Sequence, residues 1–103
     1  MYTSTPVGIK TGHFTERQRQ RLIPDDRIAL ALRWGQCFYQ GDDRVFFLGR
    51  KQLARAQRQM GTAWSDETVR KTDGTVVVVA GDGVLVTTYR NPKYIRHLRR
   101  CDA

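Results

Sequence analysis

The sequence predicts an α+β domain in which N-terminal helices pack on a four-stranded, mainly antiparallel sheet. Two observations carry this prediction. Residues 75–80 and 84–90 are rich in β-branched side chains, and the glycines of residues 81–83 between them suit the positive φ angles of a hairpin loop. Helix-forming residues fill much of the first third of the chain. The expected order of elements is α-α-β-β-α-β-β-α.

The length of the chain fits a single domain. With 103 residues, of which 40% are hydrophobic, it can bury one modest core. Residues 1–11 are polar, so we expect a flexible arm ahead of one domain over residues 12–103. No apolar run reaches the roughly 18–20 residues of a membrane span, and the N-terminus lacks the features of a secretory signal. We therefore expect a cytoplasmic protein that does not contact membranes.

Two helices are expected before the first strand. Residues 13–22 are mostly good helix formers, and Pro24 ends this stretch because proline disfavours a helical conformation in the residue before it. A second helix is expected over residues 25–34. Two aspartates suit its positive N-terminal end, and we expect Gly35 to supply a left-handed stop.

The middle of the chain predicts a hairpin and a third helix. Residues 36–40 and 44–48 are two strand-like runs joined by the turn-forming residues 41–43. Residues 52–60 form a short basic helix that ends at Gly61.

Two segments lie outside the strand pattern. Residues 62–74 are interpreted as an exposed loop, with a functional flap as the alternative. Trp34 and Trp64 are assigned to core and loop packing rather than to base stacking. After the last strand, the Asn-Pro pair at 91–92 predicts the start of a short final helix that docks through apolar residues between 94 and 98.

The charge indicates the class of partner. Eighteen basic residues against ten acidic ones give a net charge of +8, and fourteen of the eighteen are arginine. A guanidinium offers a planar fork of donors that matches two phosphate oxygens at once. A small basic domain of this kind most often meets nucleic acid or an acidic protein.

The cysteines and histidines do not suggest a metal site. Cys37 and Cys101 are interpreted as free thiols of a reduced compartment. Neither they nor the two histidines have the spacing of metal ligands, and no phosphate-binding glycine loop, carboxylate pair or nucleophile elbow is present. We expect neither a metal nor another cofactor.

The remaining polar residues suit cleavage of RNA without a metal. The 2′-hydroxyl of RNA can attack its own phosphate when one group removes its proton, another protonates the leaving oxygen, and cations stabilise the phosphorane. His13 is the candidate for proton transfer, because an imidazole exchanges protons near neutral pH. The candidates for holding the phosphate and the base are Arg17, Arg50, Lys51, Thr87, Tyr89 and Arg90.

Each of these residues also has a structural interpretation. A histidine near a helix start is more often a surface or capping residue than a catalyst. The arginines at 17, 19 and 21 can form a solvated helix face, and the basic pair at 50–51 can simply begin a helix. Threonine and tyrosine are ordinary strand residues.

A family resemblance joins these residues. The chain resembles the small toxin-like domains of the barnase–EndoU–colicin–RelE superfamily in five features. These are His13-x-x-x-Arg17, the following Arg-Leu-Ile turn, the helix that ends at Gly35, a Phe/Val-rich hairpin and the final Val-Thr-Thr-Tyr-Arg strand. The nearest group is an uncharacterised family with a His/Arg helix and a Thr-x-Tyr strand. The resemblance covers about residues 12–91.

The resemblance implies a metal-independent endoribonuclease fold, commonly a toxin paired with an acidic antitoxin or immunity protein. His13 matches the helix-borne histidine, and Thr87 with Tyr89 matches the Thr-x-Tyr pair of the EndoU branch. Arg17 and Arg90 match the basic positions of the family. The chain departs from the pattern in its insertion at 62–74 and in lacking a second active-site histidine, unless His97 folds back.

Three hypotheses follow. The first is a toxin domain that cleaves RNA, with tRNA among the candidate substrates, and leaves a 2′,3′-cyclic phosphate. It would act in the cytosol, either as a free-standing protein or as part of a larger toxin delivered into a target cell. The second is a non-catalytic, basic nucleic-acid-binding module. The third is an interaction protein whose positive surface binds an acidic partner.

Overall fold

The computed structural model describes residues 9–93 and 99–101, and it has the α+β fold that the sequence predicts. The elements run in the order α1 (Gly12–Gln20), α2 (Asp25–Trp34), β1 (Gln36–Gln40), β2 (Asp43–Leu48), α3 (Arg50–Met60), α4 (Asp66–Thr72), β3 (Thr75–Val79), β4 (Leu85–Arg90) and β5 (Arg99–Arg100).

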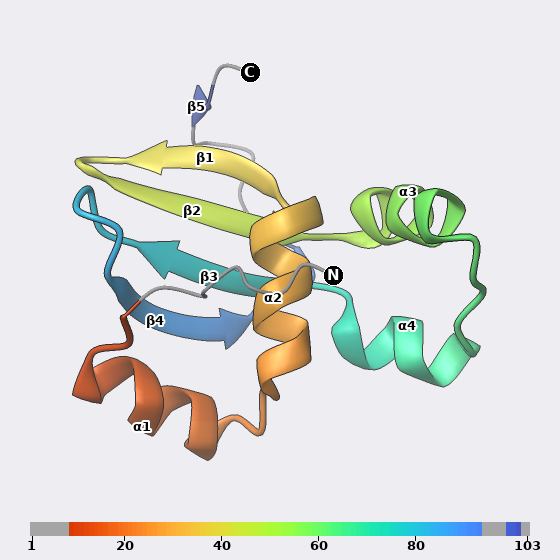
Figure 1. Ribbon diagram of the computed structural model, residues 1–103, viewed down its shortest axis with the longest axis horizontal. Coiled ribbons are helices and arrows are strands. Elements are labelled where there is room, and N and C mark those ends of the chain that lie inside the picture. The colour runs from red at the N-terminus through yellow and green to blue at the C-terminus, as the bar shows by residue number, and fades with distance from the viewer. Residues whose placement is uncertain (1–8, 94–98, 102–103) are drawn as a thin grey trace.

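The strands form one antiparallel sheet in the order β4-β3-β2-β1-β5. The two hairpins predicted from the sequence, β1–β2 and β3–β4, supply four of the strands. The hairpins lie side by side because β2 pairs with β3. The two-residue strand β5 adds to the outer side of β1, so β4 and β5 lie at opposite edges. Helix α1 runs beside β4, α2 crosses one face of the sheet, and α3 and α4 lie beyond one end of it (Figure 1).

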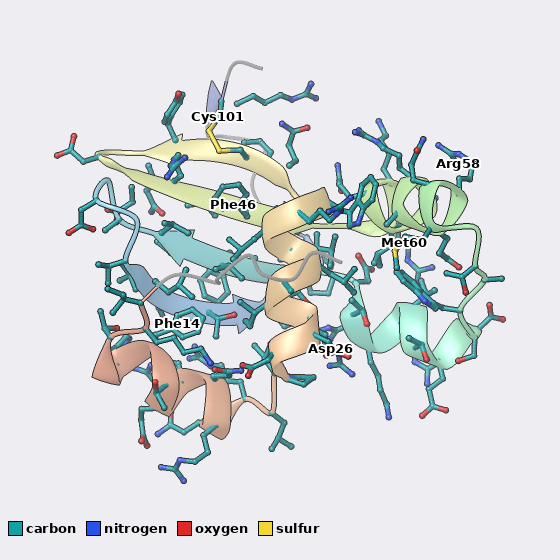
Figure 2. The ribbon with its side chains drawn as sticks, in the orientation of Figure 1. Phe14, Asp26, Phe46, Arg58, Met60 and Cys101 are labelled. Atoms are coloured by element: carbon teal, nitrogen blue, oxygen red, sulfur yellow. A yellow bond between two sulfur atoms is a disulfide. The ribbon has the colours of Figure 1, made fainter. Side chains whose placement is uncertain are left out.

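Alternation along the strands divides the apolar residues between the two faces of the sheet. The helix-face core is the larger cluster, and Phe14 of α1 is fully buried in it between α1 and β4 (Figure 2). Its buried members are Phe14, Ile23, Ile28, Ala31, Leu48, Leu53, Val77, Val79 and Leu85. The far-face cluster consists of Val45, Val76 and Val78.

The turn between α1 and α2 forms where proline predicts a break. Ile23 is buried in the helix-face core, whereas Leu22 is 81% exposed and has a φ of 53°. The left-handed backbone at Leu22 lies in the four-residue connection through which the chain turns from α1 into α2. The left-handed conformation of Leu22 costs free energy, and the burial of the neighbouring Ile23 side chain offsets this cost.

The interpretation of residues 62–74 as a loop is wrong, because α4 occupies most of this segment. The side chain of Ser65 accepts a hydrogen bond from the Thr68 amide at 3.2 Å and caps the helix. Acidic residues fill the first turn and basic residues the last, which suits the helix dipole. The capping residue and the charge pattern are visible in the sequence, but the helix that they mark is only seven residues long.

The prediction of free thiols is also wrong, since Cys37 and Cys101 form a disulfide (Figure 2). The two residues lie opposite each other where β5 pairs with β1, with Cα atoms 5.2 Å apart, and the Cys101 amide donates to the Cys37 carbonyl at 2.9 Å. The bond joins residues 64 positions apart in the sequence, so it follows from a strand pairing that local patterns do not indicate. The predicted final helix falls largely on residues 94–98, outside the described residues.

The end of the predicted N-terminal arm is paired with the sheet. The Leu85 amide donates to the Ile9 carbonyl at 2.8 Å, and the Thr11 amide donates to the Leu85 carbonyl at 3.1 Å. Residues 1–8 lie outside the described part of the chain. Among the helices within residues 9–93, none combines the length and apolar character that crossing a bilayer requires.

Gly74 and Gly61 offer a test of the fold, because both have positive φ angles, of 90° and 67°. A Cβ on Gly74 would lie 2.6 Å from the Pro92 nitrogen, whereas a Cβ on Gly61 meets open space. We expect Gly61→Ala to cost about 1 kcal/mol of unfolding free energy, from backbone strain alone. Gly74→Ala should cost more than about 3 kcal/mol, because it adds a backbone clash. Denaturant unfolding measures both, and equal losses would contradict the packing described.

Candidate functional site

Helix α1 is held along the outer edge of β4 by three polar contacts. The Thr11 amide donates to the Leu85 carbonyl, and the Thr11 hydroxyl donates to the Val86 carbonyl at 3.3 Å. At the other end of the helix, the Arg21 guanidinium donates to the Thr88 carbonyl at 3.1 Å. Thr11 also caps α1 by accepting from the Phe14 amide at 3.0 Å. The helix is therefore fixed at both ends against the same strand.

A histidine and two arginines line one side of this helix. His13 and Arg17 of α1 and the C-cap residue Arg21 are spaced four residues apart, so they form one row along the helix and its end. The contact of Arg21 with β4 shows that this row, which we call the α1 row, runs towards the strand edge. His13 is exposed and Arg17 is half-buried.

Within the α1 row, Arg17 Nε donates a hydrogen bond to His13 Nε2 at 3.4 Å. An imidazole nitrogen accepts such a bond through its lone pair. The bond is long, and a phosphate oxygen would attract the guanidinium more strongly than a neutral nitrogen does. An anion that binds Arg17 would therefore free the basic nitrogen of His13.

The two β4 residues of the predicted site lie on the other side of the sheet from the helix-face core. Thr87 pairs with Val78 and Tyr89 with Val76, and Tyr89 packs against the far-face cluster. Thr88, between them, points the opposite way and is fully buried. Because Arg21 binds the carbonyl of Thr88, the α1 row reaches the strand between Thr87 and Tyr89. Of the α1 row, Arg21 contacts the backbone of β4, whereas the side chains of Thr87 and Tyr89 lie on the far face of the sheet.

The remaining predicted phosphate ligands lie near the junction of α3, α4 and the strand ends. Arg50 Nε forms an ion pair with Asp73 Oδ2 at 3.2 Å, and Asp73 is 8% exposed. Arg90 donates to the backbone carbonyl of Arg70, and Lys51 is exposed in the first turn of α3. Arg50 thus links the start of α3 to the C-cap residue of α4, and Arg90 links β4 to α4.

Arg21 is the residue that sequence reasoning missed. It was grouped with Arg17 and Arg19 as a solvated helix face. The spacing from Arg17 could have placed it on the side of His13, but its bond to β4 depends on the tertiary fold. Arg19 faces away from the row and binds Glu16 at 2.8 Å. That hydrogen bond, together with the positive charge of Arg19, lowers the pKa of the Glu16 carboxyl.

A three-residue polar cluster links α1 to the start of α2. Asp25 Oδ1, in the first turn of α2, accepts hydrogen bonds from Lys10 at 2.8 Å and from Gln18 at 2.7 Å. These bonds stabilise the charged form and lower the pKa of Asp25. Lys10 precedes α1, Gln18 lies in α1 and Asp25 lies in α2, so the cluster ties these three segments together.

In the part of the chain that the structure describes, no group of three or more His, Cys, Asp or Glu side chains is arranged to hold a metal ion. No protein-family model matches the chain, and comparisons with curated proteins and with solved structures find no significant match. The superfamily resemblance therefore stays a prediction that rests on the motif residues.

The Asp25 cluster predicts a pH dependence. Because the folded-state pKa of Asp25 is lowered, its stabilising contribution is complete above the unfolded value of about 3.9 and is lost as the pH falls through the folded-state pKa. We expect Lys10→Met to raise the pKa of Asp25 towards its ordinary value, and Gln18→Leu to raise it less, since Lys10 makes the larger contribution. Titration of the Asp25 carboxyl carbon by NMR measures both. An Asp25 pKa that Lys10→Met leaves unchanged would contradict this arrangement.

Proposed function

We propose that this chain is a metal-independent endoribonuclease domain that cleaves RNA through its own 2′-hydroxyl. The observation that carries the proposal is the α1 row, in which an exposed imidazole is hydrogen-bonded to Arg17 and followed by an arginine fixed at the β4 edge. An imidazole beside two guanidiniums supplies a proton acceptor and phosphate-binding cations within one site.

The chemistry follows from the bond between Arg17 and His13. A phosphate that draws Arg17 towards it frees His13 Nε2, which takes the proton of the 2′-hydroxyl. The 2′-oxygen then attacks phosphorus, and the bond from phosphorus to the 5′-oxygen breaks. The leaving oxygen takes a proton from the imidazolium or from water, and a 2′,3′-cyclic phosphate remains. Arg17 and Arg21 stabilise the charge of the phosphorane, while Tyr89 and Thr87 contact the base or the phosphate from across the strand edge.

The biological setting is part of the same proposal. An RNA-cleaving domain of net charge +8 acts on RNA in the cytosol and is restrained by an acidic antitoxin or immunity protein. A disulfide is typical of proteins that meet an oxidising environment. The Cys37–Cys101 bond therefore favours a toxin that is delivered into its target cell over one that stays in a reduced compartment.

The second candidate function is a basic RNA-binding module without catalysis. It is favoured by the placement of Thr87 and Tyr89 on the far face of the sheet, and by the internal contacts of Arg50 and Arg90. In such a module, His13 would be an ordinary surface residue and the arginines would hold the RNA backbone.

Cleavage of total RNA in the presence of EDTA separates the two functions. We expect cleavage with 2′,3′-cyclic phosphate ends, a rate lowered about 10²–10⁴-fold in His13→Ala, and a large loss in Arg17→Gln. Arg19→Gln is the matched control, because it removes the same charge from the opposite side of α1 and should leave the rate unchanged. Intact RNA with salt-sensitive binding would instead establish the module. Equal loss in Arg17→Gln and Arg19→Gln would reject the α1 row as the site.

A further inference from the structure

A second surface of the molecule has the chemistry of a ligand site. A cavity of about 720 Å³ opens between α2, the end of α3 and α4, and we call it the α2–α4 groove. Its apolar lining includes Leu30, Trp34, Met60 and Trp64, and Arg27 and Arg33 of α2 also line it. Met60 and Asp26 mark the α3 and α2 sides of the groove in Figure 2. The volume suits one or two aromatic rings with their attached groups.

The groove contains both tryptophans of the chain. Trp34 and Trp64 pack against the helix-face core, but both are only half-buried and also line the groove. Met60, beside them, is 51% exposed. Part of the indole surface is thus left open, in a position where flat apolar groups can stack.

The cations of the groove come from the outer side of α2. The Arg33 guanidinium lies 5.3 Å from the ring centroid of Trp34, which makes a stacked pair of one cation and one indole. Arg27 adds a second positive charge, and Asp26 is the single acidic residue among the described lining residues. The charge of the groove therefore complements an anionic ligand.

We propose that the α2–α4 groove is a base-stacking subsite for single-stranded RNA, an inference that rests on the proposed function. Open indole surface takes one or two bases, and Arg27 and Arg33 hold the flanking phosphates. Aromatic side chains combined with arginine are the usual means of binding single-stranded nucleic acid without sequence preference. The groove includes Pro24, three residues after Arg21, so one strand of RNA can extend from the α1 row around the α1–α2 turn.

The test uses intrinsic fluorescence, because every tryptophan of the chain lies in the groove. The probe is a 2′-O-methyl oligoribonucleotide of about eight residues, which lacks the free hydroxyl that cleavage requires. A base-free sugar–phosphate oligomer of equal length is the control. We expect the first to quench the fluorescence and the second to bind without quenching. Quenching by both oligomers, or by neither, would overturn the proposal.

Variants separate the groove from the α1 row. We expect Arg33→Gln to weaken binding of the 2′-O-methyl oligomer more than Arg19→Gln, which removes the same charge from α1. Trp64→Leu should weaken it about tenfold, with thermal melting as the check that the protein stays folded. Equal effects of Arg33→Gln and Arg19→Gln would mean that the groove does not hold the RNA.

His13→Ala should retain full quenching, which makes the two proposals separable. RNA cleavage without quenching would refute the groove and leave the proposed function standing, whereas quenching without cleavage would do the reverse. A fluorescence change with an acidic amphipathic peptide, and none with the oligonucleotide, would reassign the groove to a protein partner.

Discussion

The attachment of α1 to the outer edge of β4 is the constraint on which the rest of the structure depends. An edge strand exposes unpaired backbone groups that must find partners. Here Thr11 and Arg21 satisfy carbonyls of β4 at the two ends of the helix, and Phe14 fills the core between them. The same contacts that protect the edge fix the rotation of α1, and this rotation decides which side chains face outwards beside the strand.

The positions of the two candidate surfaces follow from that rotation and from the turn after α1. His13 and Arg17 lie on the side that Arg21 fixes against β4, whereas the Lys10–Asp25–Gln18 cluster links α1 to the start of α2. Leu22, with its left-handed backbone, lies in the short connection after which α2 crosses the sheet. The outer side of α2 then forms the α2–α4 groove. Two surfaces suited to an anionic ligand therefore flank one short turn.

The sequence predicts the elements that local chemistry determines. The hairpin loop at 81–83, the break before Pro24 and the stop at Gly61 each depend on a few neighbouring residues, and all three are found. Gly83 and Gly61 have positive φ angles, of 93° and 67°, but Gly81 does not, and Gly35 ends α2 with an extended backbone rather than a left-handed one. Local sequence patterns do not indicate which distant segments pair, so the prediction that Cys37 and Cys101 are free thiols is wrong. The bond from Arg21 to Thr88 was missed for the same reason. Helix α4 was missed although its capping signals are local, because seven residues give too short a pattern to outweigh a loop composition.

The central claim is that the α1 row binds RNA phosphate beside β4. Its most direct test is an NMR titration of the ¹⁵N-labelled protein with a 2′-deoxy dinucleotide, which binds without being cleaved. The structure predicts that the signals of the Arg17 Nε–H group and the His13 ring nitrogens change most, because phosphate breaks the bond between them. The signals of the Arg21 side chain and the amides of residues 87–89 should change as well. Saturation of the protein with no change in the His13 and Arg17 side-chain signals would contradict the account.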